Sequence, residues 1–365
     1  MVRAHGDALA RKRALRPEER STLRAIERCR TAVLGGHLDV CTECGYQKPA
    51  YNSCRNRHCP KCQALAQARW IDKRVERTLP VHYFHVVFTL PAELRALAKR
   101  HREVVFDILF ASASKTLLRL GEDPKRLGAE LGITMVLHTW TRDLRFHPHV
   151  HAIVTGGGLS QDGSRWVRAG ETFLFPVHVM GALFRGKMIA ALQSAHERRK
   201  LDLSSVDVSA LSKIRWVIYA KRPFGGPQQV IQYLGRYTHR VGISNSRLLS
   251  MDERGVTFRT KTGTATVAAE AFVARFLQHV LPARFVKIRH YGLHSASHAC
   301  SRLRLAKRLL APGPPEAPAA QDHDTACLIR RLTGIDVRIC PACHKPSLVR
   351  EPLPEQSRAP PARAA

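Results

Sequence analysis

Apolar and polar residues follow two different periods along this chain, which together predict both helices and strands. In QALAQARWIDKRVERTL, residues 63–79, apolar side chains recur at helical spacing and basic side chains fall on or near the opposite face. Short runs rich in β-branched residues predict strands; they are HVVFTLP, ended by Pro91, then ITMVLHTW, HVHAIVTGGG and IRWVIYAK. The mixture predicts an α+β fold.

The order of these segments predicts how they pair. A short polar link separates ITMVLHTW from HVHAIVTGGG, as in an antiparallel pair, and GVTFRTKTGTATV predicts a hairpin that turns at Thr262–Gly263. Helices are predicted in residues 1–35, 92–120, 177–200 and 270–280. Beyond residue 311 the chain is rich in Pro and Ala, which predicts a linker and a disordered tail.

The net charge of the chain indicates which kind of partner it binds. Lys and Arg total 59 against 29 acidic residues, a formal net charge of +30. Such an excess repels itself in a compact protein, and a polyanion offsets it, so nucleic acid is the first candidate partner. An anionic membrane is second, but no apolar run of about 18 residues is present to span one. The charged first residues lack the apolar stretch of a secretory signal, so we expect a cytoplasmic protein without a membrane partner.

The ten cysteines of a cytoplasmic protein are expected to be metal ligands or free thiols. Two CxxC pairs, separated by fourteen residues, predict one structural zinc site with the ligands Cys41, Cys44, Cys59 and Cys62. Because His37, Cys54 and His58 lie among them, a different ligand set or a second ion is an alternative.

A further CxxC pair lies near the C-terminus. Cys340 and Cys343, followed by His344, form half of a zinc site that Cys327 or His323 could complete. The alternative is a pair of solvent-exposed thiols.

Two histidines in FHPHVHAIVTGGG share one side of a predicted strand. Side chains alternate along a strand, so His149 and His151 project the same way with Cα atoms about 7 Å apart, within reach of one divalent ion. The alternative is a pair that faces solvent or satisfies hydrogen bonds in the core. His147 precedes Pro148, which makes its orientation less predictable.

Two tyrosines in YLGRYTHR share one face of a predicted helix. Tyr233 and Tyr237 are four positions apart, a spacing that core packing also produces. Their helix is polar for a buried surface, and tyrosine can act as a covalent nucleophile on phosphorus. A phenol with a pKa near 10 is weak at neutral pH, and a metal ion that polarises the phosphate would compensate.

Together, HPHVH, the downstream YLGRYTHR and the upstream SCRNRHCPKC resemble the two-tyrosine HUH rolling-circle transposases of bacterial insertion sequences, with their N-terminal zinc-binding domain. The resemblance covers residues 10–310 and implies a palm-like antiparallel sheet with helices. It implies that His149 and His151 bind Mg²⁺ or Mn²⁺, and that Tyr233 and Tyr237 form 5′-phosphotyrosine links to single-stranded DNA.

A third ligand of this metal site is not identified by the sequence. The candidates are His138, Asp143, His147, Gln232 and His239. Hard divalent ions prefer oxygen ligands, which favours Asp143 or Gln232. The three glycines after the histidines would let the chain turn away beside a phosphate, or form a plain flexible hairpin turn.

The predicted organisation has three parts: basic helices and a zinc-binding domain in residues 1–80, a catalytic domain in 81–310 and a tail in 311–365. The predicted function is a transposase that cleaves and rejoins single-stranded DNA at insertion-sequence ends, with structural zinc and catalytic Mg²⁺ or Mn²⁺. The alternatives are a plasmid replication initiator or relaxase with the same chemistry, a metal nuclease that uses water, and a non-catalytic zinc-ribbon protein that binds DNA.

Overall fold

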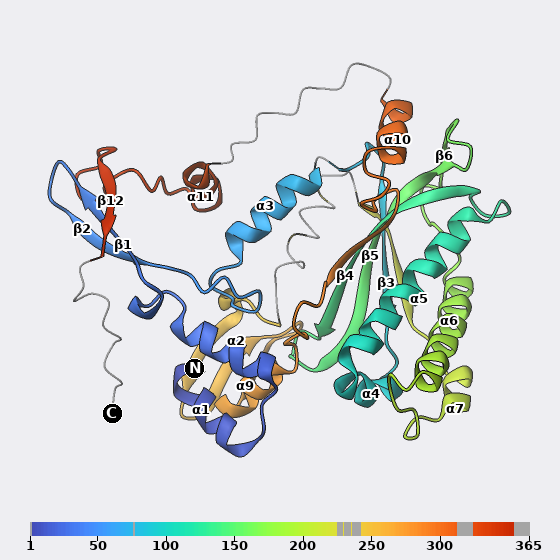
Figure 1. The fold of residues 1–365 in the computed structure, drawn as a ribbon, viewed down its shortest axis with the longest axis horizontal. Coiled ribbons are helices and arrows are strands. Elements are labelled where there is room, and N and C mark those ends of the chain that lie inside the picture. The colour runs from blue at the N-terminus through green and yellow to red at the C-terminus, as the bar shows by residue number, and fades with distance from the viewer. Residues whose placement is uncertain are drawn as a thin grey trace. The chain divides into compact units, whose positions relative to one another are not determined.

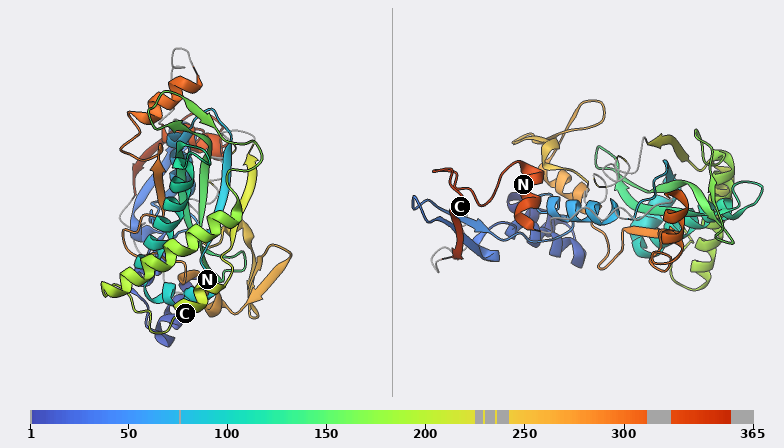
Figure 2. Two further views of the ribbon diagram at one scale, coloured as in Figure 1. Left: turned by 90° about the vertical axis from the view of Figure 1, so that its right-hand side faces the viewer. Right: turned by 90° about the horizontal axis from the view of Figure 1, so that it is seen from above.

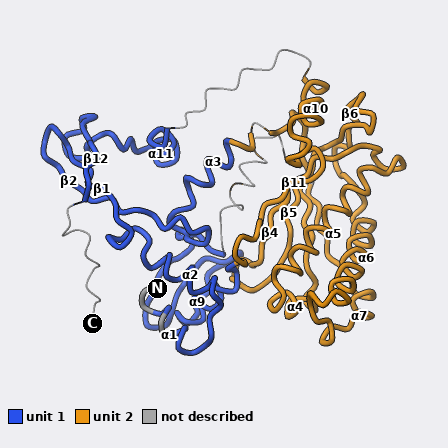
Figure 3. The backbone as a smooth tube through the Cα atoms, in the orientation of Figure 1, with its two compact units in different colours: residues 1–72, 239–280, 318–365 blue, residues 73–238, 281–317 orange. Residues whose placement is uncertain are grey.

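A computed structural model of the chain describes residues 2–75, 77–224, 229, 235, 242–311 and 324–353. It contains two compact units: residues 1–72, 239–280 and 318–365 form unit 1, and residues 73–238 and 281–317 form unit 2 (Figure 3). Contacts in space define these units, and the three-part division made at residues 80 and 310 stays a prediction.

Unit 2 is built on an antiparallel six-stranded sheet, which confirms the predicted α+β class. The strands follow the order β11-β4-β5-β3-β7, and β6 pairs with β5. Their bounds are β3 Tyr83–Thr89, β4 Ala129–Trp140, β5 Phe146–Ser160, β6 Trp166–Arg168, β7 Ile218–Phe224 and β11 Ile288–Gly292. The predicted antiparallel pair is β4 with β5.

Two long helices cover one face of this sheet (Figures 1 and 2). The helices of unit 2 are η2 Ala92–Leu94, α4 Arg95–Arg100, α5 Arg102–Glu122, α6 Val177–Glu197, α7 Val208–Lys213 and α10 Arg302–Leu310. Phe106 of α5 and Phe184 of α6 are fully buried against strand residues such as Phe88 and Val150. Full burial of such side chains stabilises the fold by about 1.5–3 kcal/mol each, so this core fixes the sheet.

Strand alternation gives the opposite face of the sheet a different composition. Leu137 and Val150 point into the core, so the residues beside them in sequence point the other way. The pairing registers bring five histidines to that second face: His85, His138, His149, His151 and His290. We call it the histidine face.

The three glycines of GGG lie inside β5, so both predictions for them, a turn beside a phosphate and a flexible hairpin turn, were wrong. The strand continues because neighbouring chains leave no room for side chains there. A Cβ at Gly156 would lie 2.2 Å from the His82 ring, and one at Gly158 2.5 Å from the carbonyl oxygen of Glu130. Gly157 has φ +147°, and a Cβ there would lie 2.4 Å from the carbonyl oxygen of Val167. The glycines permit close packing.

Unit 1 combines a small helical core with two three-stranded sheets. Its elements are α1 Val2–Lys12, α2 Pro17–Arg28, η1 Ala32–Leu34, β1 Gly36–Cys41, β2 Gln47–Tyr51, most of α3 Ala64–Val75, η3 Asn245–Arg247, β8 Leu248–Asp252, β9 Gly255–Arg259, β10 Thr264–Val267, α9 Ala269–Leu277, α11 Thr325–Thr333 and β12 Leu348–Pro352; the last three residues of α3 belong to unit 2. Helices α1, α2 and α9 share an apolar core around Leu23 and Phe276. The β9–β10 hairpin turns where the sequence predicted it.

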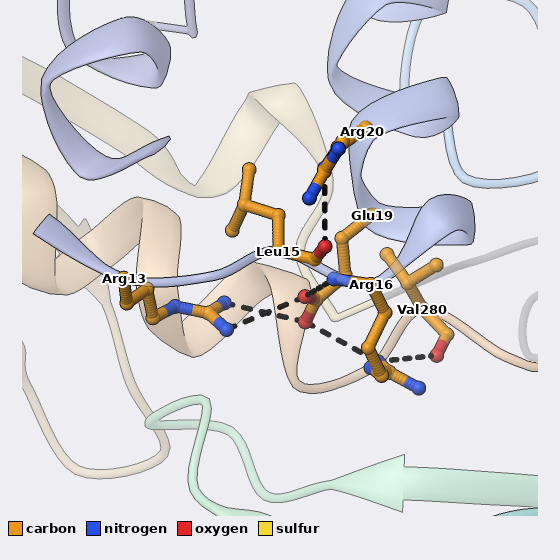
Figure 4. Close-up of polar contacts among 6 residues, drawn as sticks. All are labelled: Arg13, Leu15, Arg16, Glu19, Arg20 and Val280. Carbon is orange, nitrogen blue, oxygen red and sulfur yellow. Dashed lines mark hydrogen bonds and ion pairs between the residues drawn. The ribbon is translucent and has the colours of Figure 1, made fainter. Parts of the chain in front are cut away.

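A buried carboxylate organises the start of α2 (Figure 4). The side chain of Glu19 is 2% exposed and accepts hydrogen bonds from the Arg16 amide at 2.9 Å and from both guanidinium groups of Arg13 and Arg16. Arg16 also donates to the carbonyl oxygen of Val280, which follows α9. Although burial raises the pKa of Glu19, the hydrogen bonds from Arg16 and Arg13 outweigh it and lower that pKa below its ordinary value.

The prediction of a disordered tail beyond residue 311 was wrong for residues 324–353. These residues form α11 and β12, and β12 pairs antiparallel with β1 (Figure 1). Asp324 caps α11 by accepting from the Ala326 amide, and Gly334 ends it with φ +74°. Both are ordinary helix-end signals, but the Pro-rich composition on either side obscured them.

Candidate metal centres

Three histidines converge on the histidine face. The ligand atoms of His138, His149 and His151 all lie within 4.8 Å of one another. His149 and His151 alternate along β5, and His138 of β4 stands directly opposite His149 in the pairing register. The structure therefore brings the two predicted histidines together and adds His138, which the sequence offered only as one of several candidates.

Hydrogen bonds from outside the cluster orient two of these rings. Nδ1 of His149 lies 2.7 Å from the carbonyl oxygen of His147, to which it can donate. Nδ1 of His151 lies 2.8 Å from Nε2 of His85 on β3. Histidines that bind metals usually donate their second N–H in this way, which leaves Nε2 available as the ligand.

Burial keeps these imidazoles neutral. It lowers the pKa of His149 to about 4, and it lowers the pKa of His151 well below its ordinary value, with help from the neighbouring His149 and His85. The pKa of His85 is lowered to about 4, mainly by burial and to a smaller extent by the nearby charge of Lys221. Neutral imidazole is the form that binds a metal ion, so the cluster fits a divalent cation at neutral pH.

Two other candidates for the third ligand are hydrogen-bonded to groups outside the cluster. The His147 ring lies 5.3 Å from the His149 ring between centroids, and Nδ1 of His147 accepts a hydrogen bond from Arg95 at 2.9 Å. The carboxylate of Asp143 is bonded to Thr141 and Arg145. The remaining candidates, Gln232 and His239, lie outside the described residues.

The predicted nucleophiles also lie outside the described residues. Tyr233 and Tyr237 follow β7, which is hydrogen-bonded to β3 and so is two strands away from the β5 histidines. On β7 itself, Tyr219 and Lys221 pair with Val87 and His85 and therefore stand on the histidine face. Tyr219 is 54% exposed there.

The four cysteines predicted to share one zinc ion lie in two separate clusters. Cys59 and Cys62 lie with Cys29 and Cys54, whereas Cys41 and Cys44 lie with Cys340 and Cys343. Both clusters belong to unit 1. The predicted zinc site thus combined two cysteines of one cluster with two cysteines of the other.

In the first cluster, Sγ of Cys54 lies 3.6 Å from Sγ of Cys62, and Sγ of Cys59 lies 3.6 Å from Sγ of Cys29. A tetrahedron of sulfur atoms about 2.3 Å from a zinc ion has edges of about 3.8 Å, so both separations fit zinc. Sequence reasoning missed Cys29, because it stands alone at the end of α2, without a second cysteine at ligand spacing.

Sequence reasoning also missed His85 as a partner of the cluster, although it recognised the strand that contains this residue. It occurs in the predicted strand HVVFTLP, and only the pairing of β3 with β5 shows that it lies diagonally next to His151. Strand order is not readable from the sequence, so this partner could not be assigned.

Among the residues that the structure describes, no helix is both long and apolar enough to cross a bilayer.

Comparison with known proteins places these sites in a family. Residues 1–90 match a family described as "Transposase zinc-binding domain", and residues 132–302 match one described as "Putative transposase". The chain is 41% identical to "Putative transposase y4qJ" of Sinorhizobium fredii, over 96% of this chain and 93% of that protein. It is 28% identical to "Transposase for insertion sequence element IS801" of Pseudomonas savastanoi pv. phaseolicola, over 82% of this chain and 77% of that protein.

No solved structure matches the chain. The first family contains Cys29, Cys54, Cys59 and Cys62 within its limits, and the second contains the three clustered histidines. The chain belongs to the IS91 family of insertion-sequence transposases, enzymes that act on DNA, as its motifs predicted.

Proposed function

We propose that this transposase cleaves and rejoins single-stranded DNA at the ends of its insertion sequence through 5′-phosphotyrosine intermediates on Tyr233 and Tyr237. The observation that carries the proposal is the convergence of His138, His149 and His151 within 4.8 Å on one face of the sheet. Helices cover the other face, so we expect the DNA to approach from the histidine face.

We infer that these three histidines hold a divalent ion, Mg²⁺ or Mn²⁺. When bound, such an ion polarises the phosphate that is cut and so activates it toward a weak nucleophile. Mg²⁺ prefers oxygen ligands, whereas imidazole suits transition metals, so we expect Mn²⁺ to support the faster reaction.

The nucleophile is a tyrosine hydroxyl. Its oxygen attacks phosphorus, the bond from phosphorus to the 3′ oxygen breaks, and that oxygen leaves as a 3′-hydroxyl after taking up a proton. The phosphodiester is thereby exchanged for a 5′-phosphotyrosine. A new 3′-hydroxyl can later attack the phosphotyrosine and release the enzyme, so rejoining needs no ATP. The sequence contains no Walker A motif, in agreement.

Two parts of the chain would hold the DNA and stabilise the fold. Lys221 and the exposed Tyr219 on the histidine face suit a phosphate and a stacked base, respectively. Cys29, Cys54, Cys59 and Cys62 would bind a structural zinc ion, since a closed set of four thiolates leaves no position for a substrate.

The test incubates the purified chain and Mn²⁺ with a library of single-stranded oligonucleotides, then detects protein–DNA adducts on denaturing gels and by mass spectrometry. We expect an adduct on Tyr233 or Tyr237, none in the Y233F/Y237F double variant, and at least a hundredfold slower formation in H138A, H149A or H151A. Tyr51→Phe, on β2 of unit 1 and outside the proposed site, is the matched control and should form the adduct normally.

Other outcomes point to the alternatives. Cleavage without an adduct would indicate a metal nuclease that uses water, and binding without cleavage would indicate a DNA-binding module. Either result would overturn the proposed chemistry. A replication initiator or relaxase would form the same adduct, but both relatives named above are transposases.

A further inference from the structure

We propose that Cys41, Cys44, Cys340 and Cys343 bind one zinc ion that fastens the C-terminal segment, residues 324–353, into the N-terminal zinc-binding module. This site is separate from the Cys29 cluster. The zinc-binding family matches residues 1–90 only and therefore does not include two of the four ligands.

The four sulfur atoms are arranged for a metal ion. Sγ of Cys41 lies 3.6 Å from Sγ of Cys343, and Sγ of Cys44 lies 3.7 Å from Sγ of Cys340. These separations are close to the edge of about 3.8 Å in a tetrahedral zinc–thiolate site. They are far longer than the S–S bond of about 2.05 Å in a disulfide.

The two CxxC turns also share one backbone geometry, although they lie about 300 positions apart. The amides of Cys41 and Cys340 each donate, at 2.8 Å, to the carbonyl oxygen five residues later. The residue after the second cysteine has a positive φ in both turns, +71° at Gly45 and +59° at His344. Each turn thus presents two thiolates to one side, and the two turns face each other across the same point.

Amides of the turns support the sulfur atoms as thiolates. The Cys44 amide donates to Sγ of Cys41, and the Ala342 amide donates to Sγ of Cys340, both at 3.4 Å. The hydroxyl of Ser347, which lies 3.0 Å from Sγ of Cys41, lies on the C-terminal segment. The segment therefore contributes both ligands and a supporting group.

The sheet around this site is too small to hold the segment by itself. β12 pairs with β1 from Cys41–Leu348 to His37–Pro352, and β2 pairs with the other edge of β1. Most of their side chains are exposed or half-buried, so little apolar area is removed from water. Surface ion pairs such as Arg331–Asp72 add about 0–1 kcal/mol each. Small sheets of this kind usually need a metal or a disulfide.

The ion would therefore link segments that are 302 positions apart in sequence, from Cys41 to Cys343. Unit 2 lies between these two segments along the chain, so the ion would join parts of the sequence that precede and follow unit 2. Residues 324–353 would then be an integral part of the zinc-binding module.

The test uses elemental mass spectrometry to measure the number of zinc ions per chain in the purified full-length protein and in its serine variants. We expect C340S/C343S to lose one zinc ion, and C41S/C44S to lose the same one. Combining both pairs should still lose only one, because the pairs share an ion. Combining C340S/C343S with C59S/C62S should lose two. The control C300S/C327S, which changes two cysteines outside both clusters, should lose none.

These counts keep the result decisive even if a variant folds poorly. A variant that unfolds the module would lose both ions, whereas loss of the proposed site alone removes one. The combined C41S/C44S/C340S/C343S variant could instead lose two ions, and adding C59S/C62S to it could remove a third. The two pairs would then bind different ions, and the proposal fails. Unchanged zinc in C340S/C343S overturns it directly.

A second readout tests the fastening itself. A specific protease site inserted in residues 312–323 would separate the C-terminal segment from the rest of the chain after cleavage. With zinc present, the fragment should co-elute with the remainder in gel filtration, and a chelator should release it. Release in the presence of zinc, or retention after zinc has been fully removed, would contradict the proposed role of the ion.

Discussion

At the scale of single residues, buried polar groups are stable here because each has its partners. Glu19 is a charged side chain that is only 2% exposed, and it is tolerated because one amide and two guanidinium groups surround it. The metal-cluster histidines follow the opposite rule, since burial keeps them uncharged. Burial is thus compatible with a charged carboxylate in unit 1, where positive groups surround it, and with uncharged imidazoles in unit 2.

We expect Glu19→Gln to lower the free energy of unfolding of unit 1 by about 1–3 kcal/mol, since the half-buried guanidinium groups of Arg13 and Arg16 lose a charged, buried acceptor. The pKa of Glu19 is lowered in the folded state, so its contribution is present above the ordinary value of 4.5. It is lost as the pH falls through the folded-state pKa. Thermal unfolding followed from pH 7 to about pH 3 measures this.

The gap in melting temperature between wild type and E19Q should therefore narrow as the pH falls. Glu18→Gln is the control, because it removes the same charge from the same turn of α2. An E19Q variant that melts like E18Q at neutral pH would show that the buried carboxylate does not stabilise the helix start.

At the scale of elements, β5 determines the site. It carries two of the clustered histidines, it pairs with both β3 and β4, and its glycine-rich end permits β6 to approach. Its alternation places the ligands on one face and the core residues on the other. Any change that shifts this strand therefore affects the fold and the metal ligands together.

We expect Gly157→Ala to destabilise unit 2 by about 1–3 kcal/mol, because alanine is strained at φ +147° and its Cβ would lie 2.4 Å from a carbonyl oxygen. Gly186→Ala on α6 is the matched control: nothing lies within 4 Å of its Cβ position, so it should be neutral or stabilise by up to about 1 kcal/mol. Thermal unfolding compares the two variants. Equal melting temperatures would show that β5 and β6 can separate without cost.

Local patterns predicted the elements better than they predicted their partners. The strands containing His85, His138 and His149 were all recognised from the sequence, and β4–β5 pairing was predicted from a short link. The pairing of β3 with β5, which adds His85, depends on strand order and was not predictable. Likewise, the CxxC spacing identified cysteine ligands. Whether Cys41 shares a metal site with Cys59 or with Cys340 depends on contacts between residues far apart in sequence, which the spacing does not reveal.

At the scale of the whole molecule, the excess of positive charge is the property most directly related to DNA. The net charge is +30, and cations also lie near the proposed site. After burial, the charges of Arg74 and Arg77 lower the pKa of His290, and Lys221 does the same for His85. Phosphates of a bound strand would compensate these charges, so binding should depend strongly on salt.

We expect the logarithm of the association constant for single-stranded DNA to fall linearly with the logarithm of the salt concentration, because each neutralised phosphate contributes about 0.7 to the slope. Lys221→Gln should reduce the steepness by about 0.7, as one phosphate contact is lost. Lys213→Gln is its control, since α7 packs against α6 on the helix-covered side of the sheet.

Tyr219→Ala separates stacking from charge. Loss of one stacked base should weaken binding by about 1–3 kcal/mol at every salt concentration and leave the slope unchanged. Fluorescence anisotropy with a labelled oligonucleotide, from low to moderate salt, measures all three variants. If K221Q and K213Q give the same slope as wild type while Y219A has no effect, the histidine face does not carry the DNA. The charge excess would then act through another part of the molecule, and the strand would have to reach the metal ligands from there.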